Sequence, residues 1–403
     1  MKIAIFTDVY GPGAGGIATS IESQKRTLEE QGHQVTVFYP SLKKPLEKNT
    51  IVIPVCKHFH PDGIAVARRP RIVEKWILKN YPNFKDFDIV HSHYEAGCSI
   101  AGMRLARYFG IPLVQTMHGR EDSGVMENFW SPFKTIVAFL LCWWHSWYLP
   151  HYTKVHKDDH LATSYPRAFM WSLMVNHANY ADLVITPSKH FKNKLQYYGV
   201  KKPFRILTNT IDDNLLPKDI TMRKLENGEP LRVIWNSRLS HEKRIWEFLH
   251  AIANVNFPYK LEVYGDGNEL TKAKLWSEHH KLPIVFHGSQ PREKILSTMK
   301  KSHLGILASY NFDNQPMTLL EAVAAGLPMF FCDPDMKEVV PNGSYICASG
   351  PYIPEMTEAL NKLYKHPEQI AKMSQTAMEH RKDVLRSTHK KELSDIYQKM
   401  TKH

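Results

Sequence analysis

Apolar runs of strand length alternate with amphipathic helical patterns along most of the chain. The runs lie at residues 2–7, 35–39, 88–93, 112–119 and 181–186 in the first half, and at residues 231–236, 260–264, 283–288, 304–309 and 329–332 in the second half. Strands that alternate with helices in this way pair in parallel, and the helices cover both faces of the sheet. The pattern therefore predicts an α/β protein with doubly wound parallel sheets.

The length of the chain indicates more than one domain. Its 403 residues are enough for two domains of about 200 residues, each with its own core. Residues 208–230 show no sustained periodicity, so they predict a linker between a domain at 1–207 and a second domain at 231–384. Residues 385–403 follow as a last helical segment rich in Lys and His.

Composition narrows the class of protein. Hydrophobic residues make up 43% of the chain, which excludes wholesale disorder. The net charge of +12 indicates an acidic partner: a nucleic acid, an anionic membrane or a phosphorylated substrate. The first apolar run breaks at Asp8, too early for a secretory leader, so we expect a cytoplasmic protein. The five cysteines are scattered singly, which disfavours a disulfide framework and a zinc site.

Two stretches of the first half bear on a membrane partner. Residues 68–85 combine several cations with aromatic and aliphatic residues. A helix there either packs its apolar side inward and solvates its charges, or lies on an anionic membrane surface. Residues 130–150 are the most apolar part of the chain, but their unbroken core is too short to span a bilayer. We expect a buried helix there; an interfacial element with its aromatic residues at headgroup level is the alternative.

A glycine-rich segment joins the first predicted strand to the first predicted helix. Gly11, Gly13 and Gly16 fit the spacing G-x-G-x-x-G in the context that this motif needs. In a dinucleotide-binding protein the second strand ends in an acid that holds the ribose, whereas here it runs into residues 38–41, Phe-Tyr-Pro-Ser. The glycines are therefore better explained as a loop that lets backbone approach a ligand closely.

In the second half, residues 313–328 have the features of a phosphate cradle. Pro316 is suited to the start of a helix, whose first N–H groups, at Met317 and Thr318, point outward with the positive end of the helix dipole. Asp313 precedes this helix and Glu321 lies inside it, so two carboxylates flank the cradle. Such a pair suits the hydroxyl groups of a sugar.

Cations follow the strand at residues 231–236. Arg238 lies in the turn, and Lys243 and Arg244 lie in the first turn of a helix that Ser240 is expected to cap. Cations there are disfavoured by roughly 0.3–1 kcal/mol unless an anion binds. Arg238 and Lys243 therefore become candidates for binding an anion.

Two short motifs raise the question of a metal. His91 and His93 form H-x-H, and Asp333 and Asp335 form D-x-D. The D-x-D lies late in an αβ repeat, after the helix of Glu321, and we expect a metal site at neither motif.

Taken together, these motifs resemble those of the retaining family 4 glycosyltransferases (group 1) of GT-B fold. In that family a signature E-x7-E places one acid on the donor sugar and one on the ribose, which carries over to Asp313 and Glu321. The departure is Asp in place of the first Glu. The family's R-x4-K clamp on the donor diphosphate corresponds to Arg238 and Lys243. The segment Thr-Met-His-Gly resembles the one whose His contacts the donor sugar, which is His118 here.

The resemblance also implies backbone contacts with the donor. They fall on Gly15 and Gly16 in the glycine loop, on the turn from Gly288 to Gln290 that accepts the base, and on Met317, Thr318 and Leu319 in the helix that follows Pro316. The family's glycine pair near Asp333 is missing from this chain.

The resemblance implies two Rossmann-like doubly wound domains facing across a cleft. Residues 1–207 would bind the acceptor, residues 231–384 the nucleotide sugar, and residues 385–403 would cross back to the first domain. Within the family, the chain resembles bacterial diacylglycerol glucosyltransferases. This implies retaining transfer of a hexose, with UDP-glucose as donor and a membrane lipid such as diacylglycerol as acceptor, without a metal or other cofactor, at the inner face of the cell membrane.

Two alternatives remain open. One is a hexosyltransferase that acts on a polysaccharide, teichoic acid or polyprenyl-linked sugar. The other is a non-catalytic nucleic-acid or nucleotide-binding protein, but the chain shows no arginine-rich tract or aromatic sheet face. We therefore expect no nucleic-acid partner.

Overall fold

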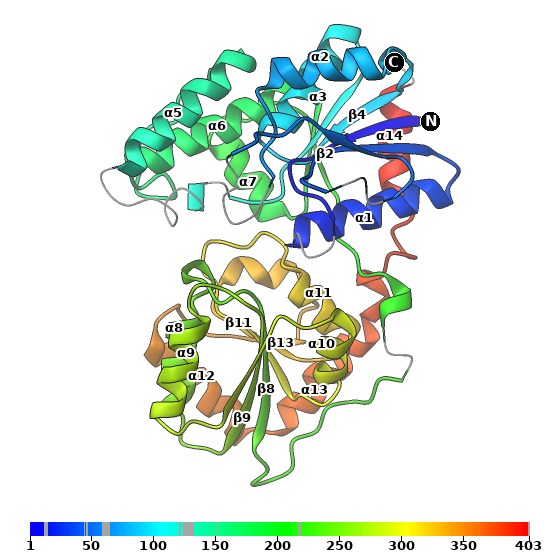
Figure 1. Ribbon diagram of the computed structural model, residues 1–403. Helices are drawn as coiled ribbons and strands as arrows, with labels where there is room; N and C mark the ends of the chain where they lie inside the picture. Colours follow the sequence, from blue (N-terminus) through cyan, green and yellow to red (C-terminus); the bar gives the residue numbers. More distant parts are fainter. Residues whose placement is uncertain are drawn as a thin grey trace. The chain divides into compact units, whose positions relative to one another are not determined.

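The computed structural model describes the whole chain except residues 12–14, 44, 46, 59–64, 121, 124–132, 151, 217–218 and 402–403. Gly13 and the first three residues of the apolar stretch, 130–132, thus lie outside the described residues. The chain divides into two compact units (Figure 1). Unit 1 consists of Met1–Thr208 with Lys390–His403, and unit 2 consists of Asn209–His389.

Unit 1 is built on a seven-stranded sheet in the order β3-β2-β1-β4-β5-β6-β7, in which all neighbours are parallel. Its strands are β1 (Lys2–Phe6), β2 (Gln34–Pro40), β3 (Thr50–Ile53), β4 (Ile89–Ser92), β5 (Leu113–Thr116), β6 (Leu183–Thr186) and β7 (Phe204–Ile206). Its helices are α1 (Gly15–Glu30), α2 (Pro70–Asn80), α3 (Gly97–Phe109), α5 (Phe133–Tyr148), α6 (Tyr165–Tyr180), α7 (Lys189–Tyr197) and α14 (Glu392–Thr401), with a 3-10 turn η2 (Phe84–Asp86).

Helices α3 and α14 pack closely on opposite faces of this sheet. Gly102 lets α3 approach the sheet, because a Cβ there would lie 2.2 Å from the ring of Phe6. On the other face, α14 places Leu393 and Tyr397 in a core cluster with Ile3, Val37 and other residues. The last helix of the chain therefore contributes to the core of unit 1.

Unit 2 is built on a six-stranded parallel sheet in the order β10-β9-β8-β11-β12-β13. Its strands are β8 (Leu231–Asn236), β9 (Tyr259–Tyr264), β10 (Ile284–Gly288), β11 (Leu304–Leu307), β12 (Met329–Phe331) and β13 (Tyr345–Cys347). Its helices are α8 (Ile245–Ala253), α9 (Leu270–His279), α10 (Arg292–Met299), α11 (Met317–Ala324), α12 (Ile353–Lys365) and α13 (Glu368–Glu379), with 3-10 turns η3 (Asp213–Leu215), η4 (His241–Lys243), η5 (Pro334–Glu338) and η6 (Arg381–Val384).

These two sheets confirm the predicted fold class, with two Rossmann-like, doubly wound units. Much of the segment predicted as a linker, residues 208–230, packs onto unit 2. Ile211 forms a β-bridge with Leu385, and the buried Arg223 donates hydrogen bonds to the carbonyls of Met299 and Ala325.

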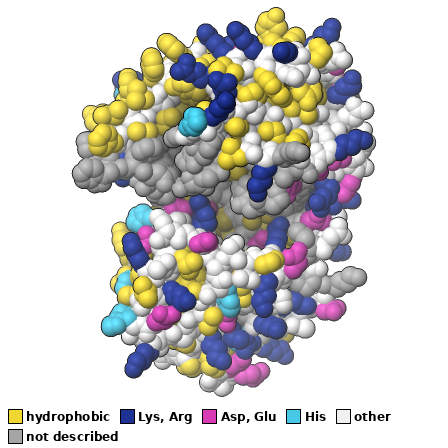
Figure 2. Space-filling view, viewed as in Figure 1, with side chains coloured by type: hydrophobic (Ala, Val, Ile, Leu, Met, Phe, Trp, Pro, Cys, Tyr) yellow, Lys and Arg dark blue, Asp and Glu magenta, His cyan; other side chains and the backbone are white. Residues whose placement is uncertain are grey.

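The expectation that residues 130–150 form a helix buried in the core is wrong. The helix is present as α5, and Ala138 and Cys142 pack inward with Met170 and Leu173 of α6. Its other side is open to water. Six large apolar side chains there are between 48% and 67% exposed: Phe133, Ile136, Phe139, Leu140, Trp143 and Trp147. In Figure 2, hydrophobic side chains gather over the part of unit 1 where Figure 1 places α5.

For residues 68–85 the structure shows an inward apolar side and an outward charged side. Val73 and Ile77 of α2 are buried in the core of unit 1. The cations of this segment are exposed: Arg68, Arg69, Arg71, Lys75, Lys79 and Lys85. Among the described residues, no helix is both long and apolar enough to cross a bilayer.

Candidate active site

The order of strands in unit 2 reverses between β8 and β11, which lie side by side. In doubly wound sheets, ligands bind beyond the carboxyl ends of the strands at such a reversal. Asn236 ends β8, and Arg238 follows two residues later; Ser309 and Asp313 follow the end of β11. The predicted donor residues of the second half therefore start from the two strands that flank the reversal.

Lys243 and Asp313 form the centre of this site. The ammonium of Lys243 donates to both carboxylate oxygens of Asp313, at 2.6 and 2.9 Å, and lies 4.9 Å from the centre of the Phe312 ring. Ser309 also donates its hydroxyl to Asp313. The side chains of Lys243 and Asp313 are only 11% and 12% exposed, so the pair is held in one geometry beside the sheet.

The segment that carries Lys243 differs from the prediction. The single helix expected from Ser240 is wrong: residues 241–243 form the 3-10 turn η4, and α8 begins at Ile245. Between them Arg244 is left-handed with φ 59°, a conformation that costs a residue with a Cβ roughly 1–2 kcal/mol. Its guanidinium offsets this by donating to Glu247 and to the Pro351 carbonyl. The helix-dipole argument for Lys243 therefore fails, and Asp313 is the group that fixes it.

Arg238 lies in a different environment. Its side chain is 71% exposed, and its Nη2 donates to Glu242 at 3.0 Å. Glu242 is buried and also accepts from the Ser240 hydroxyl. Arg238 is thus tethered at its guanidinium but open to solvent, whereas Lys243 is enclosed.

Glu321 projects from α11 into a buried polar cluster. It is 7% exposed, accepts from Asn236 Nδ2 at 2.9 Å and pairs with Arg292 Nε at 2.8 Å. Burial raises its pKa, although Arg292 and Asn236 lower it in part. Thr318 ties the start of α11 to the same place, since its hydroxyl donates to the Asn236 carbonyl at 2.7 Å.

Arg292, at the start of α10, was not identified from the sequence. Its Nη2 is buried and has no hydrogen-bond partner among the residues that the structure describes. A buried guanidinium nitrogen without an acceptor is well suited to a phosphate or hydroxyl oxygen of a ligand. The only signal in the sequence was a cation directly after Pro291, which is too common to stand out.

The start of α11 agrees with the prediction, since the helix begins at Met317, directly after Pro316. Met317 and Thr318 are partly exposed in its first turn. Leu319 is different: its side chain is fully buried in the core, and its N–H donates to the Pro316 carbonyl.

The turn after β10 lies next to the turn after β9. Gly288 has φ 66°, and its carbonyl accepts from the Gly265 N–H at 2.9 Å. Gln290 is exposed and donates its side-chain amide to the His287 carbonyl. Gly265 itself has φ 135°, and a Cβ there would lie 2.0 Å from the Ser237 carbonyl oxygen. Sequence analysis did not single out Gly265, although it allows this turn to pack against the one that carries Arg238.

In unit 1 the predicted glycines open α1. Gly15 has φ 86°, a conformation that other residues adopt at a cost, and Gly15 and Gly16 are both exposed. Asp8 was not predicted as a site residue. Its buried carboxylate accepts from the backbone N–H groups of Cys98 and Ser99, at 2.8 and 3.1 Å, and so caps α3, while burial raises its pKa.

His118 lies just beyond the carboxyl end of β5 and is partly exposed. Its Nε2 is 3.0 Å from Nδ1 of the buried His93. Burial lowers the pKa of His118 to about 4, so the ring is neutral near pH 7. A neutral ring in this position is suited to hydrogen bonding rather than to charge neutralisation.

Comparison with known families agrees with this geometry. Residues 14–215 match the model of Glycosyltransferase Family 4, and residues 218–380 match that of Glycosyl transferases group 1. The chain belongs to glycosyltransferase family 4.

Individual relatives of this glycosyltransferase cover most of its length. It is 27% identical over 348 residues to the alpha-monoglucosyldiacylglycerol synthase of Streptococcus pneumoniae, covering 82% of this chain and 70% of that one. It is 26% identical over 365 residues to the lipopolysaccharide 1,6-galactosyltransferase of Escherichia coli, covering 87% and 81%. Its fold is similar to that of Anabaena HepE, solved in complex with UDP-glucose, with a TM-score of 0.66, 14% identity and coverage of 99% and 100%.

The two motifs considered as metal sites have structural partners in the glycosyltransferase. Asp333 accepts from the N–H groups of Asn311 and Asp335, at 2.7 and 3.0 Å, and so holds two turns together. His91 and His93 are both buried and hydrogen-bonded to each other. Within the described part of the chain, no group of three or more His, Cys, Asp or Glu side chains is placed to hold a metal ion.

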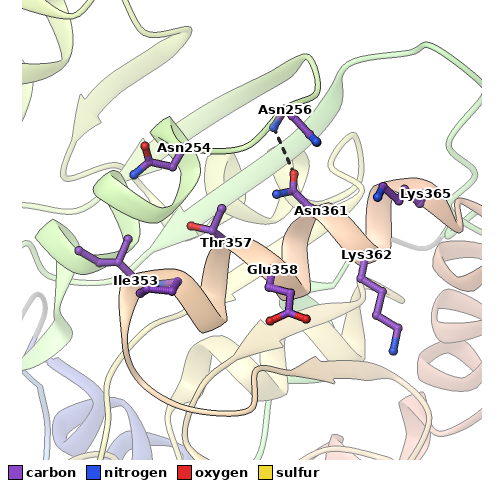
Figure 3. A pocket seen from close by; sticks show the side chains of 9 residues that line it. Asn254, Asn256, Ile353, Thr357, Glu358, Asn361, Lys362 and Lys365 are labelled. Atoms are coloured by element: carbon purple, nitrogen blue, oxygen red, sulfur yellow. Dashed lines mark hydrogen bonds between the residues drawn. The ribbon is translucent and has the colours of Figure 1, made fainter.

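A separate hollow of about 670 Å³ lies on unit 2 between the end of α8 and the outer side of α12 (Figure 3). Asn254, Asn256, Thr357, Asn361 and Lys362 contribute to its lining. The Asn256 N–H donates to the Asn361 side-chain oxygen across it. None of the predicted site residues lines this hollow, so it is not the donor site.

Proposed function

We propose that this glycosyltransferase transfers glucose from UDP-glucose to a membrane lipid, with diacylglycerol as the acceptor and with retention of the anomeric configuration. The enzyme would act from the cytoplasmic side, as a peripheral protein on an anionic membrane. Its similarity to a monoglucosyldiacylglycerol synthase supports this choice of acceptor.

The observation that carries the proposal is the open apolar face of α5. Six large apolar side chains on one helix, each about half exposed, form a patch that a monomeric soluble protein rarely leaves in water. Two of them are tryptophans, which favour the headgroup level of a bilayer. Arg104 of α3 links the C-terminal end of α5 to α2, because it donates to the Tyr148 carbonyl and pairs with Glu74.

The charges around this face support an anionic membrane as its partner. The cations on and before α2 are exposed, and Figure 2 shows Lys and Arg side chains next to hydrophobic ones on the surface of unit 1. Each cation near anionic lipid contributes roughly 1 kcal/mol. An apolar face with cations at its edge is the pattern of an interfacial helix rather than of a protein–protein contact.

The proposed chemistry depends on stabilising the departing diphosphate. Negative charge grows on the diphosphate as the glycosidic bond breaks. This charge would be stabilised by Lys243, by Arg238 and by the first turn of α11. Asp313, fixed by Lys243 and Ser309, would hold the sugar, and Glu321 would hold the ribose. In transfer with retention, the departing phosphate oxygen takes the proton of the acceptor hydroxyl, so we propose no separate general base.

The test is a panel of UDP-, GDP- and ADP-hexoses, assayed for release of the nucleoside diphosphate. Each donor is offered without lipid, with phosphatidylglycerol vesicles, and with the same vesicles containing diacylglycerol. We expect rapid release only from UDP-glucose with diacylglycerol vesicles, and an α-linked glucolipid as product. Release from UDP-glucose at the same rate without lipid would contradict a lipid acceptor.

A second candidate acceptor is a glycan or a polyprenyl-linked sugar. Its support is the similarity to a lipopolysaccharide galactosyltransferase, which extends over 87% of this chain. In this case a detergent-solubilised or soluble glycan acceptor would stimulate donor turnover, and diacylglycerol would not.

A further inference from the structure

Three polar side chains of unit 2 form a cluster at the carboxyl end of β8: Asn236, Arg292 and Glu321. Glu321 Oε1 lies 2.8 Å from Arg292 Nε, and Glu321 Oε2 accepts from Asn236 Nδ2 at 2.9 Å. Asn236 is held in turn, because its carbonyl accepts from the Thr318 hydroxyl. The carboxylate of Glu321 is therefore fixed from two sides.

This cluster keeps both a donor and acceptor sites that are not used. Arg292 Nη2 is buried without a hydrogen-bond partner in the described part of the chain, although the side chain as a whole is 23% exposed. Buried N–H groups are nearly always paired, so this one points to an acceptor that a ligand brings. A carboxylate accepts at about four sites, and Arg292 and Asn236 occupy two of those on Glu321.

The unused donor and the carboxylate are close enough to contact one and the same ligand oxygen. In a planar guanidinium, Nε and Nη2 lie about 2.3 Å apart, because two C–N bonds of about 1.33 Å meet there at about 120°. Nη2 therefore lies within about 5.1 Å of Glu321 Oε1, since Nε is 2.8 Å from that oxygen. An oxygen about 2.7 Å from the carboxylate and about 2.9 Å from Nη2 can bridge up to about 5.6 Å.

The charge of the cluster favours a hydroxyl group as that ligand. Arg292 and Asn236 act against the rise in the pKa of Glu321 that burial causes, which favours the carboxylate form. The positive charge of Arg292 is then balanced by Glu321, and a phosphate oxygen would add a second negative charge beside that carboxylate. A hydroxyl is uncharged and both donates and accepts, so it can donate to Glu321 while it accepts from Arg292.

We propose that Arg292 and Glu321 form one ribose subsite, in which a hydroxyl of the nucleotide ribose donates to Glu321 and accepts from Arg292 Nη2. This step rests on the proposed function, in which Glu321 holds the ribose of the donor. The place of Arg292 in the chain agrees with it. Arg292 follows Gln290 by two residues, and Gln290 ends the turn that is expected to accept the base, to which the ribose is bonded. Arg292 is then the residue that selects ribonucleotides over deoxyribonucleotides.

Three variants separate the contact with ribose from the ion pair. Arg292→Lys keeps a cation for Glu321 but removes the second N–H of the guanidinium edge. Arg292→Met is similar in length and removes every donor. Lys294→Gln is the matched control, because it removes an exposed cation from the same helix, two residues further along.

The experiment measures binding of UDP, 2′-deoxy-UDP and 3′-deoxy-UDP to the full chain by calorimetry. We expect one of the two deoxy analogues to bind the wild type and Lys294→Gln about tenfold more weakly than UDP does. In Arg292→Lys and Arg292→Met this ratio should fall to about threefold or less, since the hydroxyl keeps only Glu321. Equal affinities for all three nucleotides in the wild type, or an unchanged ratio in either Arg292 variant, would overturn the proposal.

The same measurement with GDP, ADP and their deoxy forms separates this proposal from the proposed function. Binding of GDP or ADP in place of UDP would refute UDP-glucose as donor, and the ribose test would continue with the nucleotide that binds. Binding of UDP with equal affinities for its deoxy forms would refute the subsite and leave the donor in place. Binding of none of the three would overturn the subsite, whereas transfer to diacylglycerol is measured independently in the vesicle assay.

Discussion

Replacing the two exposed tryptophans of α5 is expected to release the enzyme from anionic vesicles. Trp143 and Trp147 are 48% and 67% exposed, and their rings lie 5.0 Å apart. A large aromatic side chain buries about 200 Å² when fully enclosed, so together they offer the bilayer about 230 Å². At about 25 cal/mol per Å² this area is worth about 6 kcal/mol if it is withdrawn completely from water.

Alanine keeps part of that contact, and an interfacial helix inserts only partly, so we expect a loss of about 2 kcal/mol. This corresponds to about a 30-fold weaker partition of Trp143→Ala/Trp147→Ala into phosphatidylglycerol vesicles. Vesicle flotation and light scattering measure this partition directly, and neither depends on tryptophan fluorescence. Tyr352→Ala in unit 2 is the matched control, because Tyr352 is also 67% exposed. Equal binding of the double variant and the wild type would refute the interfacial role of α5.

Four further changes test other parts of the structure. Arg71→Gln/Lys75→Gln should weaken vesicle binding about 30-fold at low salt, since each charge contributes roughly 1 kcal/mol, and should have little effect above 0.5 M salt; a salt-independent loss would contradict a charge effect. Lys243→Ala should lower kcat/KM about 100-fold or more and weaken UDP binding in calorimetry, because it removes an enclosed cation from the departing diphosphate; unchanged UDP affinity would place the diphosphate elsewhere. Because burial raises the pKa of Glu321, the folded state favours its neutral form, so that contribution to stability is lost as pH rises above the usual value for Glu. The Tm of Glu321→Gln should therefore fall less than that of the wild type between pH 5 and 8, and parallel curves would refute this. Gly265→Ala should cost about 3 kcal/mol in urea unfolding, since its Cβ would overlap the Ser237 carbonyl; a cost below about 1 kcal/mol would show that the turn yields.

The strands at the centre of each sheet could be predicted because both of their faces are buried. Such strands appear as largely apolar runs, as in β1, where only Lys2 is polar, and in β11, which reads Leu-Gly-Ile-Leu. The edge strands β3, β7 and β13 were missed. They have three or four residues, and several of their side chains are only partly buried. In a short strand whose side chains are only partly buried, the pattern of apolar and polar residues differs too little from that of a loop to be recognised.

Helix α6 was missed for the opposite reason. Eleven of its sixteen residues are buried, including Trp171, and they lie on nearly all of its sides. A helix enclosed in this way has no polar face, so the 3.6-residue periodicity that reveals a helix is absent. Sequence alone could not distinguish it from irregular structure.

In the candidate site, sequence analysis identified the residues that belong to a motif. It did not identify the polar residues that contact them. Asp313 and Lys243 are 70 positions apart, and they meet because β8 and β11 are neighbours at the reversal of strand order. The same topology brings Asn236 to Glu321. Asn236, Ser309 and Arg292 are common polar residues without a characteristic spacing, so only the folded chain shows that they belong to the site.

The sequence showed that α5 is apolar but not where its apolar side chains would go. A hydrophobic side chain favours leaving water, and a protein core and a bilayer satisfy that preference equally well. Whether an apolar helix is covered by the protein or by a bilayer depends on how many layers of secondary structure the fold provides. The inward side of α5 packs on α6 through Ala138, Cys142, Met170 and Leu173, a small cluster separate from the main cores of unit 1. The described part of unit 1 supplies no further element to cover the outer side, on which Trp143 and Trp147 remain about half exposed. An apolar helix that forms the outermost layer of its unit needs a partner from outside it, and the exposed cations of α2, the helix to which Arg104 links its end, favour an anionic one.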